Sequence, residues 1–175
     1  MTTANDLANF VNPANARVKG SVQPSGSIIQ VVQVVKTDTY TQNSNSFTTV
    51  PGLSATITPV STSSRILVAV TVNSAVASNY NIISRISRNG TPVFIGDASG
   101  SRPRALNQGF KTSVEYTDTI SATFVDSPAS TSALTYAYQV KSGVTLYVNR
   151  TEADRDTADY DARMASSIIL MEIAG

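Results

Sequence analysis

The sequence contains no cysteine, no histidine and no tryptophan. Without cysteine there is no disulfide framework, no thiolate nucleophile and no zinc–thiolate site. Without histidine the chain lacks the usual general base near neutral pH and the commonest transition-metal ligand. The residues present therefore indicate a domain without visible catalytic chemistry and without a resident cofactor.

Charge is also scarce. Charged residues make up 14% of the chain, and 13 Lys and Arg stand against 12 Asp and Glu, for a net charge of +1. A general nucleic-acid binder needs a basic patch to neutralise phosphates, so this balance argues against nucleic acid as a partner. No stretch approaches the roughly 20 apolar residues of a membrane span, and the opening MTTANDLANF shows no secretory signal. We therefore expect synthesis in a cytoplasm and no membrane insertion.

The clearest pattern lies in Gly52–Asn73, where apolar and polar residues alternate on both sides of a polar break. The apolar members are Leu53, Ala55, Ile57, Ile66, Val68, Val70 and Val72. A period of two places each set on one face of a pleated strand. The stretch predicts two strands that share a core face, and neither strand carries a reactive group.

A hairpin is predicted around Asn89 and Gly90, the pair preferred for a two-residue type I′ turn. Counting outward from the turn places Ile86 opposite Val93. Pro92 cannot donate a hydrogen bond to a strand on its far side, so we expect an edge of the sheet there.

Further strands are predicted at Ser27–Thr37, Phe47–Val50, Thr119–Val125, Ala133–Lys141, Val144–Arg150 and Ser166–Ile173. Ser27–Thr37 is apolar on both faces, so we expect a second sheet to cover one side and another subunit or a loop to cover the other. Asp38–Ser46 and Ser99–Lys111 are predicted loops. Ser142–Gly143 is predicted to be a tight hairpin between the strands that flank it.

These elements predict an all-β fold, with turns at the spacing of a sandwich and no convincing long helix. We expect a jelly-roll-like antiparallel β-sandwich of about 8–10 strands, with an immunoglobulin-like sandwich as the alternative. Residues 27–175 form this domain in the prediction. Residues 1–26, interrupted by Pro and Gly, are predicted to be an extended N-terminal arm that lies on another protein, or else a frayed terminus.

Thr151–Arg163 is a charged loop whose carboxylates could coordinate calcium through oxygen. The candidate ligands are Asp154, Asp156 and Asp159, within the acidic run Glu152–Asp161. The spacing departs from an EF-hand loop after Asp156, and neighbouring arginines can neutralise the acids, so a salt-bridged loop is the competing interpretation. The same acids are the only material for a glycosidase pair, but no pattern predicts the cleft that such a pair needs.

A second group of candidates could bind anionic surface sugars. It comprises Arg85, Arg88, Asn89, Arg102 and Arg104, near the predicted turn and the loop that follows. Ordinary solvated or interface arginines are the alternative. Asn149-Arg150-Thr151 matches a glycosylation sequon, which without a signal peptide we interpret as accidental.

Three stretches, Gly26–Asn73, Thr123–Val140 and Tyr147–Gly175, have distinctive amino-acid sequences in a distinctive order, and together they cover most of residues 26–175. In these stretches the chain resembles a family of bacteriophage virion proteins, especially those of cyanobacterial and marine phages. The stretches carry no catalytic signature, and the arm before Gly26 is not covered.

The resemblance implies a non-enzymatic virion protein with a jelly-roll-like fold, similar to modules that form homotrimers. The first hypothesis is a trimeric tail or head fibre or receptor-binding appendage. Its arm, residues 1–26, would bind other virion proteins, and its domain would face host-surface polysaccharide. The alternative is a trimeric capsid decoration or cement protein. A third hypothesis, from another class, is a calcium-dependent carbohydrate-binding or carbohydrate-active module that uses Asp154, Asp156 and Asp159.

Overall fold

The computed structural model describes residues 11–12, 17–18, 23–77 and 79–175. Its strands are β1 (Val11–Asn12), β2 (Arg17–Val18), β3 (Ile28–Lys36), β4 (Tyr40–Gln42), β5 (Thr48–Ile57), β6 (Arg65–Val76), β7 (Tyr80–Arg88), β8 (Thr91–Val93), β9 (Asn107–Lys111), β10 (Asp118–Asp126), β11 (Leu134–Lys141), β12 (Leu146–Val148) and β13 (Ser166–Ile173). β1 and β2 pair as a short antiparallel ladder, and most of the predicted arm, residues 1–26, lies outside the described residues. Among the described residues, no helix has the length and apolar character needed to cross a membrane.

β6 is the central strand of the first sheet. One edge of β6 pairs with β10, and the other pairs first with β13 and then, further along, with β12. β3 and β4 pair in turn with the outer edges of β13 and β12. This β6 sheet therefore has four strand positions. β3 and β4 share the first, β13 and β12 share the second, β6 is the third and β10 is the fourth.

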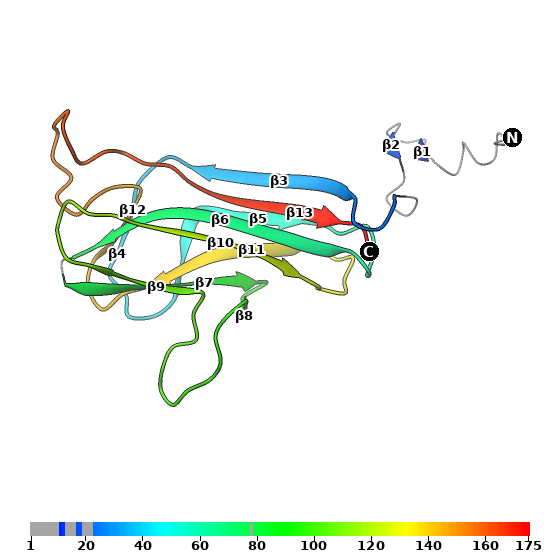
Figure 1. Ribbon diagram of the computed structural model, residues 1–175, viewed down its shortest axis with the longest axis horizontal. Helices are drawn as coiled ribbons and strands as arrows, with labels where there is room; N and C mark the ends of the chain where they lie inside the picture. Colours follow the sequence, from blue (N-terminus) through cyan, green and yellow to red (C-terminus); the bar gives the residue numbers. More distant parts are fainter. Residues whose placement is uncertain (1–10, 13–16, 19–22, 78) are drawn as a thin grey trace, which may run out of the picture.

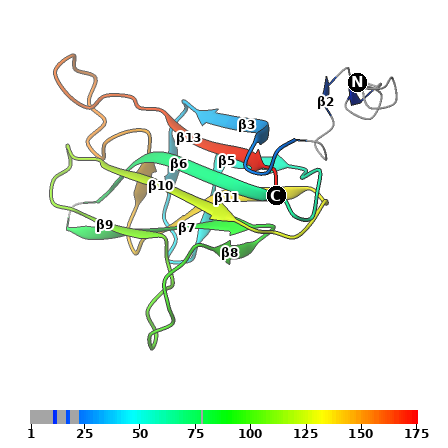
Figure 2. The same ribbon diagram turned by 45° about the vertical axis from the view of Figure 1, so that its right-hand side comes forward.

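The second sheet, the β11 sheet, follows the same plan. β5, β11 and β7 are neighbours, and β8 and β9 pair with successive stretches of the far edge of β7. Figure 1 shows the longer strands of both sheets running along the length of the sandwich, and Figure 2 shows β3 and β10 at opposite edges of the β6 sheet. Two antiparallel sheets with four positions each form a jelly-roll-like sandwich, which confirms the predicted fold class. The immunoglobulin-like alternative, with seven strands, does not fit this order.

The core lies between the two sheets and is filled by alternate residues of each strand. All the apolar residues predicted for Gly52–Asn73 are at most 3% exposed. They belong to β5 and β6, which lie in different sheets and contribute to the same core cluster. Tyr136 and Tyr138 of β11 are fully buried in that cluster. A fully buried Val, Leu or Ile contributes about 1.5–3 kcal/mol, so this shared layer is the largest stabilising term of the domain.

The Asn89–Gly90 turn has the predicted geometry. Both residues have positive φ, 48° and 85°, as a type I′ turn requires. Ile86 pairs with Val93 in the predicted register. β8, which contains Pro92, ends the strand order of its sheet, so the predicted edge is also confirmed.

Three connections differ from their prediction. Ser142–Gly143 does not form a hairpin, because β11 and β12 lie in different sheets and the chain crosses between the sheets here. Tyr40–Gln42 and Asn107–Lys111, predicted within loops, are the strands β4 and β9. A period-two pattern identifies a strand but not its partner, and short polar strands such as these are fixed by the neighbours they pair with.

Two pairs of strands in the β6 sheet, β3 with β4 and β12 with β13, are each separated by residues outside the strands, and the side chain of Asn149 hydrogen-bonds across this gap. Its Nδ2 donates to the carbonyl oxygens of Lys36 (2.9 Å) and Asp38 (3.0 Å), and its Oδ1 accepts from Ser166 Oγ (2.6 Å). The residue is fully buried, with φ of 62°, a left-handed conformation that Asn adopts more readily than most residues. This burial agrees with our interpretation that the glycosylation sequon at Asn149 is accidental.

We expect Asn149→Ala to lower the free energy of unfolding by about 2–4 kcal/mol, because buried partners lose their hydrogen bonds. Urea unfolding followed by circular dichroism measures the change. Asn107→Ala, at an exposed position of β9, is the matched control and should change stability by less than about 0.5 kcal/mol. Equal stabilities of the two variants would contradict the role given to Asn149.

Candidate functional site

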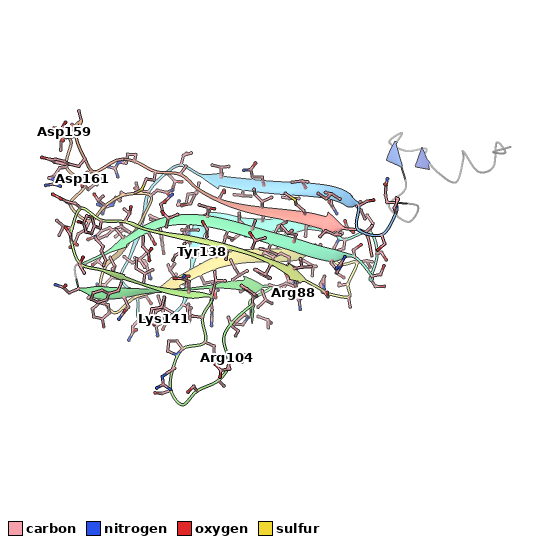
Figure 3. All side chains as sticks on the ribbon, in the orientation of Figure 1. Arg88, Arg104, Tyr138, Lys141, Asp159 and Asp161 are labelled. Atoms are coloured by element: carbon pink, nitrogen blue, oxygen red, sulfur yellow. The ribbon has the colours of Figure 1, made fainter. Side chains whose placement is uncertain are left out.

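The acidic loop, Thr151–Arg163, joins β12 to β13 at one end of the sandwich. Figure 3 shows Asp159 and Asp161 there, at the end opposite the C-terminus. The backbone N–H of Ala153 donates to the carbonyl of Val114 (3.2 Å), which ties the loop to the turn before β10. The loop is therefore attached to the sandwich near its first residues as well as through the two strands that it joins.

Lys111, the last residue of β9, contacts this loop through Glu152. Its side chain is 2% exposed, and its Nζ lies 3.5 Å from Glu152 Oε2. Burial lowers the pKa of the Lys111 ammonium, and the Glu152 carboxylate opposes that shift. A buried ammonium depends on its partner, so this pair anchors the base of the loop.

Asp161 organises the inside of the acidic loop. Its Oδ2 accepts hydrogen bonds from the backbone N–H (3.1 Å) and Nε (2.6 Å) of Arg155, and its Oδ1 accepts from Thr151 Oγ1 (2.6 Å). The side-chain hydrogen bond from Arg155, followed by that from Thr151, lowers the pKa of Asp161 from 3.8 to about 2. Asp161 is therefore a structural carboxylate, held ionised by its neighbours.

Asp154, one of the predicted calcium ligands, also forms ion pairs. Its Oδ2 lies 3.0 Å from Arg150 Nη1, and its Oδ1 lies 2.8 Å from Arg163 Nη1. Arg155 makes a further ion pair outside the loop, with Glu115 Oε1 at 2.8 Å. These ion pairs are the contacts expected from the competing interpretation of the sequence, a salt-bridged loop.

A depression of about 320 Å³ lies on the acidic loop and is lined by Asp154, Arg155, Asp156, Thr157, Asp161, Ala162 and Arg163. No group of three or more Asp, Glu, His or Cys in the described part of the chain could hold a metal ion. Asp156 and Asp159 are exposed. A calcium site formed by Asp154, Asp156 and Asp159 stays a prediction.

Two of the predicted recognition residues, Arg88 and Asn89, make internal contacts. Arg88 Nη1 lies 2.6 Å from Asp126 Oδ2, an atom that also accepts from the Tyr136 hydroxyl at 2.6 Å. This cluster joins β7 and β11 of one sheet to β10 of the other. Burial, and then the Asp126 carboxylate, raises the pKa of Tyr136. Asn89 Oδ1 accepts from the backbone N–H of Thr135 at 2.8 Å, which fixes the start of β11.

Two more of the predicted arginines, Arg102 and Arg104, lie on the projecting loop, residues 94–106, which leaves the sandwich between β8 and β9 (Figure 1). Arg104 Nε donates to the carbonyl of Gly96 at 2.7 Å and closes the neck of this loop. Arg102 Nη1 donates to Ser99 Oγ at 2.7 Å. Both arginines are exposed, and Figure 3 shows Arg104 on the loop, apart from Arg88 on the sandwich.

Arg85 belongs to a cluster that the sequence did not indicate. Its guanidinium lies 3.9 Å from the centroid of the Phe47 ring, and Lys141 Nζ lies 5.7 Å from the same centroid, within the range of a cation–π interaction. Phe47 precedes β5, whereas the two cations are on β7 and β11. Only the order of strands in the sheet brings these residues together. The predicted arginines thus occupy three separate places on the molecule.

Comparison with known proteins gives matches among solved structures. Neither a protein-family profile nor a curated protein sequence matches the chain. A solved structure described as "The 2.6A structure of Infectious Bursal Virus Derived T=1 Particles" aligns with 93% of this chain at 12% identity and a TM-score of 0.45. The alignment covers 40% of that protein, so the chain spans about two fifths of its length. At this identity and TM-score, the similarity carries no conclusion about function.

We expect the contribution of Asp161 to stability to be present above about pH 4 and to be lost as the pH falls to about 2, because its pKa is lower in the folded chain than the ordinary 3.8. Thermal unfolding of Asp161→Asn and of the native chain at several pH values measures this. The difference between them should shrink between pH 4 and pH 2. Asp156→Asn, an exposed change in the same loop, is the control; an Asp161→Asn difference that stays constant over this range would contradict the role of Asp161.

We also expect calcium to leave the thermal unfolding midpoint unchanged, because Asp154 and Asp161 are already held by arginines. Differential scanning fluorimetry in millimolar calcium and in a chelator tests this. A higher midpoint in calcium, abolished by Asp156→Asn with Asp159→Asn, would contradict this expectation and support the calcium-dependent module.

Proposed function

We propose that the chain is a non-enzymatic structural protein of a virus particle, found in the virion. The observation that carries this proposal is the order of strands, with four positions in each antiparallel sheet. Double-sheet jelly rolls of this kind occur in viral capsid and lectin domains. A fold alone does not determine a function, so the proposal also depends on the resemblance of residues 26–175 to bacteriophage virion proteins.

Within that role, we favour a homotrimeric tail or head fibre or appendage. The place where the arm joins the domain, and the position of the acidic loop, support this choice. Gly26 and Ser27, where the arm joins the domain, exchange backbone hydrogen bonds of 2.8 Å with Ala174 near the C-terminus. The acidic loop lies at the opposite end of the sandwich (Figure 3). An arm attached to the particle would therefore point that end outward.

The projecting loop is the surface we propose for contact with the host. Arg102 and Arg104 are exposed on it and retain guanidinium N–H groups beyond those bonded to Ser99 and Gly96. Guanidinium groups bind carboxylate and phosphate oxygens with fixed geometry. Anionic host-surface polysaccharide is the ligand class that fits this chemistry.

Immunogold labelling of intact particles tests the proposed role and its location. We expect gold at the tail or on projecting head fibres. Gold spread evenly over the head would instead support the alternative, a capsid decoration protein. Purified particles without gold and without peptides of this chain would contradict a virion role.

Deletion of residues 1–26 tests the arm as the attachment to other virion proteins. We expect the shortened chain to keep the β-rich circular dichroism spectrum and oligomeric mass of the full chain but to be absent from particles. Arg102→Ala with Arg104→Ala is the matched control, which should enter particles normally and reduce adsorption to host cells. Incorporation of the shortened chain at full occupancy would contradict the role of the arm.

A further inference from the structure

The outer faces of the two sheets differ in chemistry. On the β11 sheet, polar side chains form cross-strand hydrogen bonds with one another. Thr56 and Thr135 hydroxyls are 2.8 Å apart, and Arg85 Nε donates to Gln139 Oε1 at 2.7 Å. Gln139 Nε2 continues the series to Thr49 Oγ1 at 3.3 Å. This face suits contact with water.

The outer face of the β6 sheet carries an apolar row instead. Val31 of β3 pairs with Met171 of β13, Met171 with Leu67 of β6, and Leu67 with Val125 of β10. All four point away from the core, because the alternate residues of each strand are the more buried ones. The row therefore crosses every position of the sheet, and its two ends, Val31 and Val125, are 55% and 48% exposed.

The neighbouring positions extend this apolar surface toward β4 and β12. In the adjacent row Ile169 and Ala69 are paired at the centre, and the polar Gln33 and Thr123 lie at the two ends. Val35, further along β3, is 53% exposed. The row that contains Val35 is otherwise polar, and its Thr71 and Ser121 hydroxyls approach to 3.4 Å. Among the outward residues of β3, β6, β10 and β13, Arg65 is the only charged one. A surface with so little charge can meet a copy of itself without electrostatic repulsion.

The outer face of the β6 sheet is large enough to take part in an interface. Strands spaced about 4.8 Å apart, and residues that rise about 3.3 Å each along β13, give this whole face, apolar and polar positions together, roughly 450 Å². A specific interface buries roughly 1,000 Å² in total over its two partners, so the face and the strand edges beside it would both take part.

The edges of the sheet add a second reason to expect a partner. β3 pairs only with β13, so the other edge of this nine-residue strand has unpaired backbone groups in the described chain. It contains no proline, and its one charged residue, Lys36, is buried. Natural proteins protect such edges with charge, proline or a covering element. Here the unprotected edge and the apolar row meet at Val31.

We propose that further copies of this chain cover the apolar row, with the β3 side of one copy against the β10 side of the next. Each end of the row is a half-exposed valine on an edge strand, so the two ends offer the same chemistry. A head-to-tail contact of this kind closes into a ring when the rotation between successive copies allows it, and three copies would then place Met171 and Leu67 toward the axis. This inference rests on the proposed function, because it names the surface through which the proposed homotrimer forms.

Sedimentation velocity of the full chain at concentrations from about 1 to 100 µM tests the proposal, because association depends on concentration. We expect the native chain to form a discrete oligomer. Val31→Glu with Val125→Glu should weaken self-association at least about tenfold. The matched control, Thr49→Glu with Thr56→Glu, adds the same charge to the polar face and should leave the oligomer unchanged.

Circular dichroism and thermal unfolding check that each variant is folded. If the Glu variant does not fold, Val31→Thr with Val125→Thr replaces it, because Thr keeps the β-branched shape of the side chain. A native chain that stays monomeric, or a folded Val31 and Val125 variant with the native mass, would overturn the inference. Neither outcome bears on the gold labelling of particles. Conversely, a chain that associates through this row but is absent from particles would contradict only the virion role.

Discussion

The apolar layer between the two sheets is the interaction on which the other features of the molecule depend. β6 contributes alternate residues along its whole length, and Ile66, Val68 and Val72 are fully buried. Because β6 pairs with β10, β12 and β13, its register also fixes which residues of those strands face outward. A shift of one residue would exchange the core face and the apolar row. The position of Val31, Met171, Leu67 and Val125 on one outer surface is thus a consequence of how the core is packed.

Polar groups complete the structure at the places where this layer ends. Asn149 bridges the interruption in the outer strands of the β6 sheet. Arg88, Asp126 and Tyr136 join the two sheets. In the acidic loop, Asp161 and Arg155 replace the contacts that a strand would provide. These groups explain why several residues with the chemistry of a binding site have structural partners.

Local sequence patterns were sufficient to predict where the strands are, but not which strands pair with one another. The alternation in Gly52–Asn73 predicted the buried residues, and the Asn89–Gly90 turn predicted a register, because both signals are local. The crossing at Ser142–Gly143 depends on which sheet each strand joins, and so could not be predicted from a local pattern. The same limit applies to the candidate sites. The ion pairs of Asp154 were foreseen in outline because the arginines are near in sequence, whereas the approach of Arg85 to Phe47 depends on strand order.

We propose that this sandwich assembles through the outer face of the β6 sheet. Because the chain has no cysteine, a single introduced thiol reports on one position without interference. The most direct measurement is the rate of maleimide labelling of Val125→Cys in the assembled and the dilute chain, with Thr56→Cys on the polar face as the reference. We expect assembly to slow labelling at position 125 and to leave labelling at position 56 unchanged. Equal labelling of position 125 in both states, or protection of position 56 instead, would contradict assembly through this face.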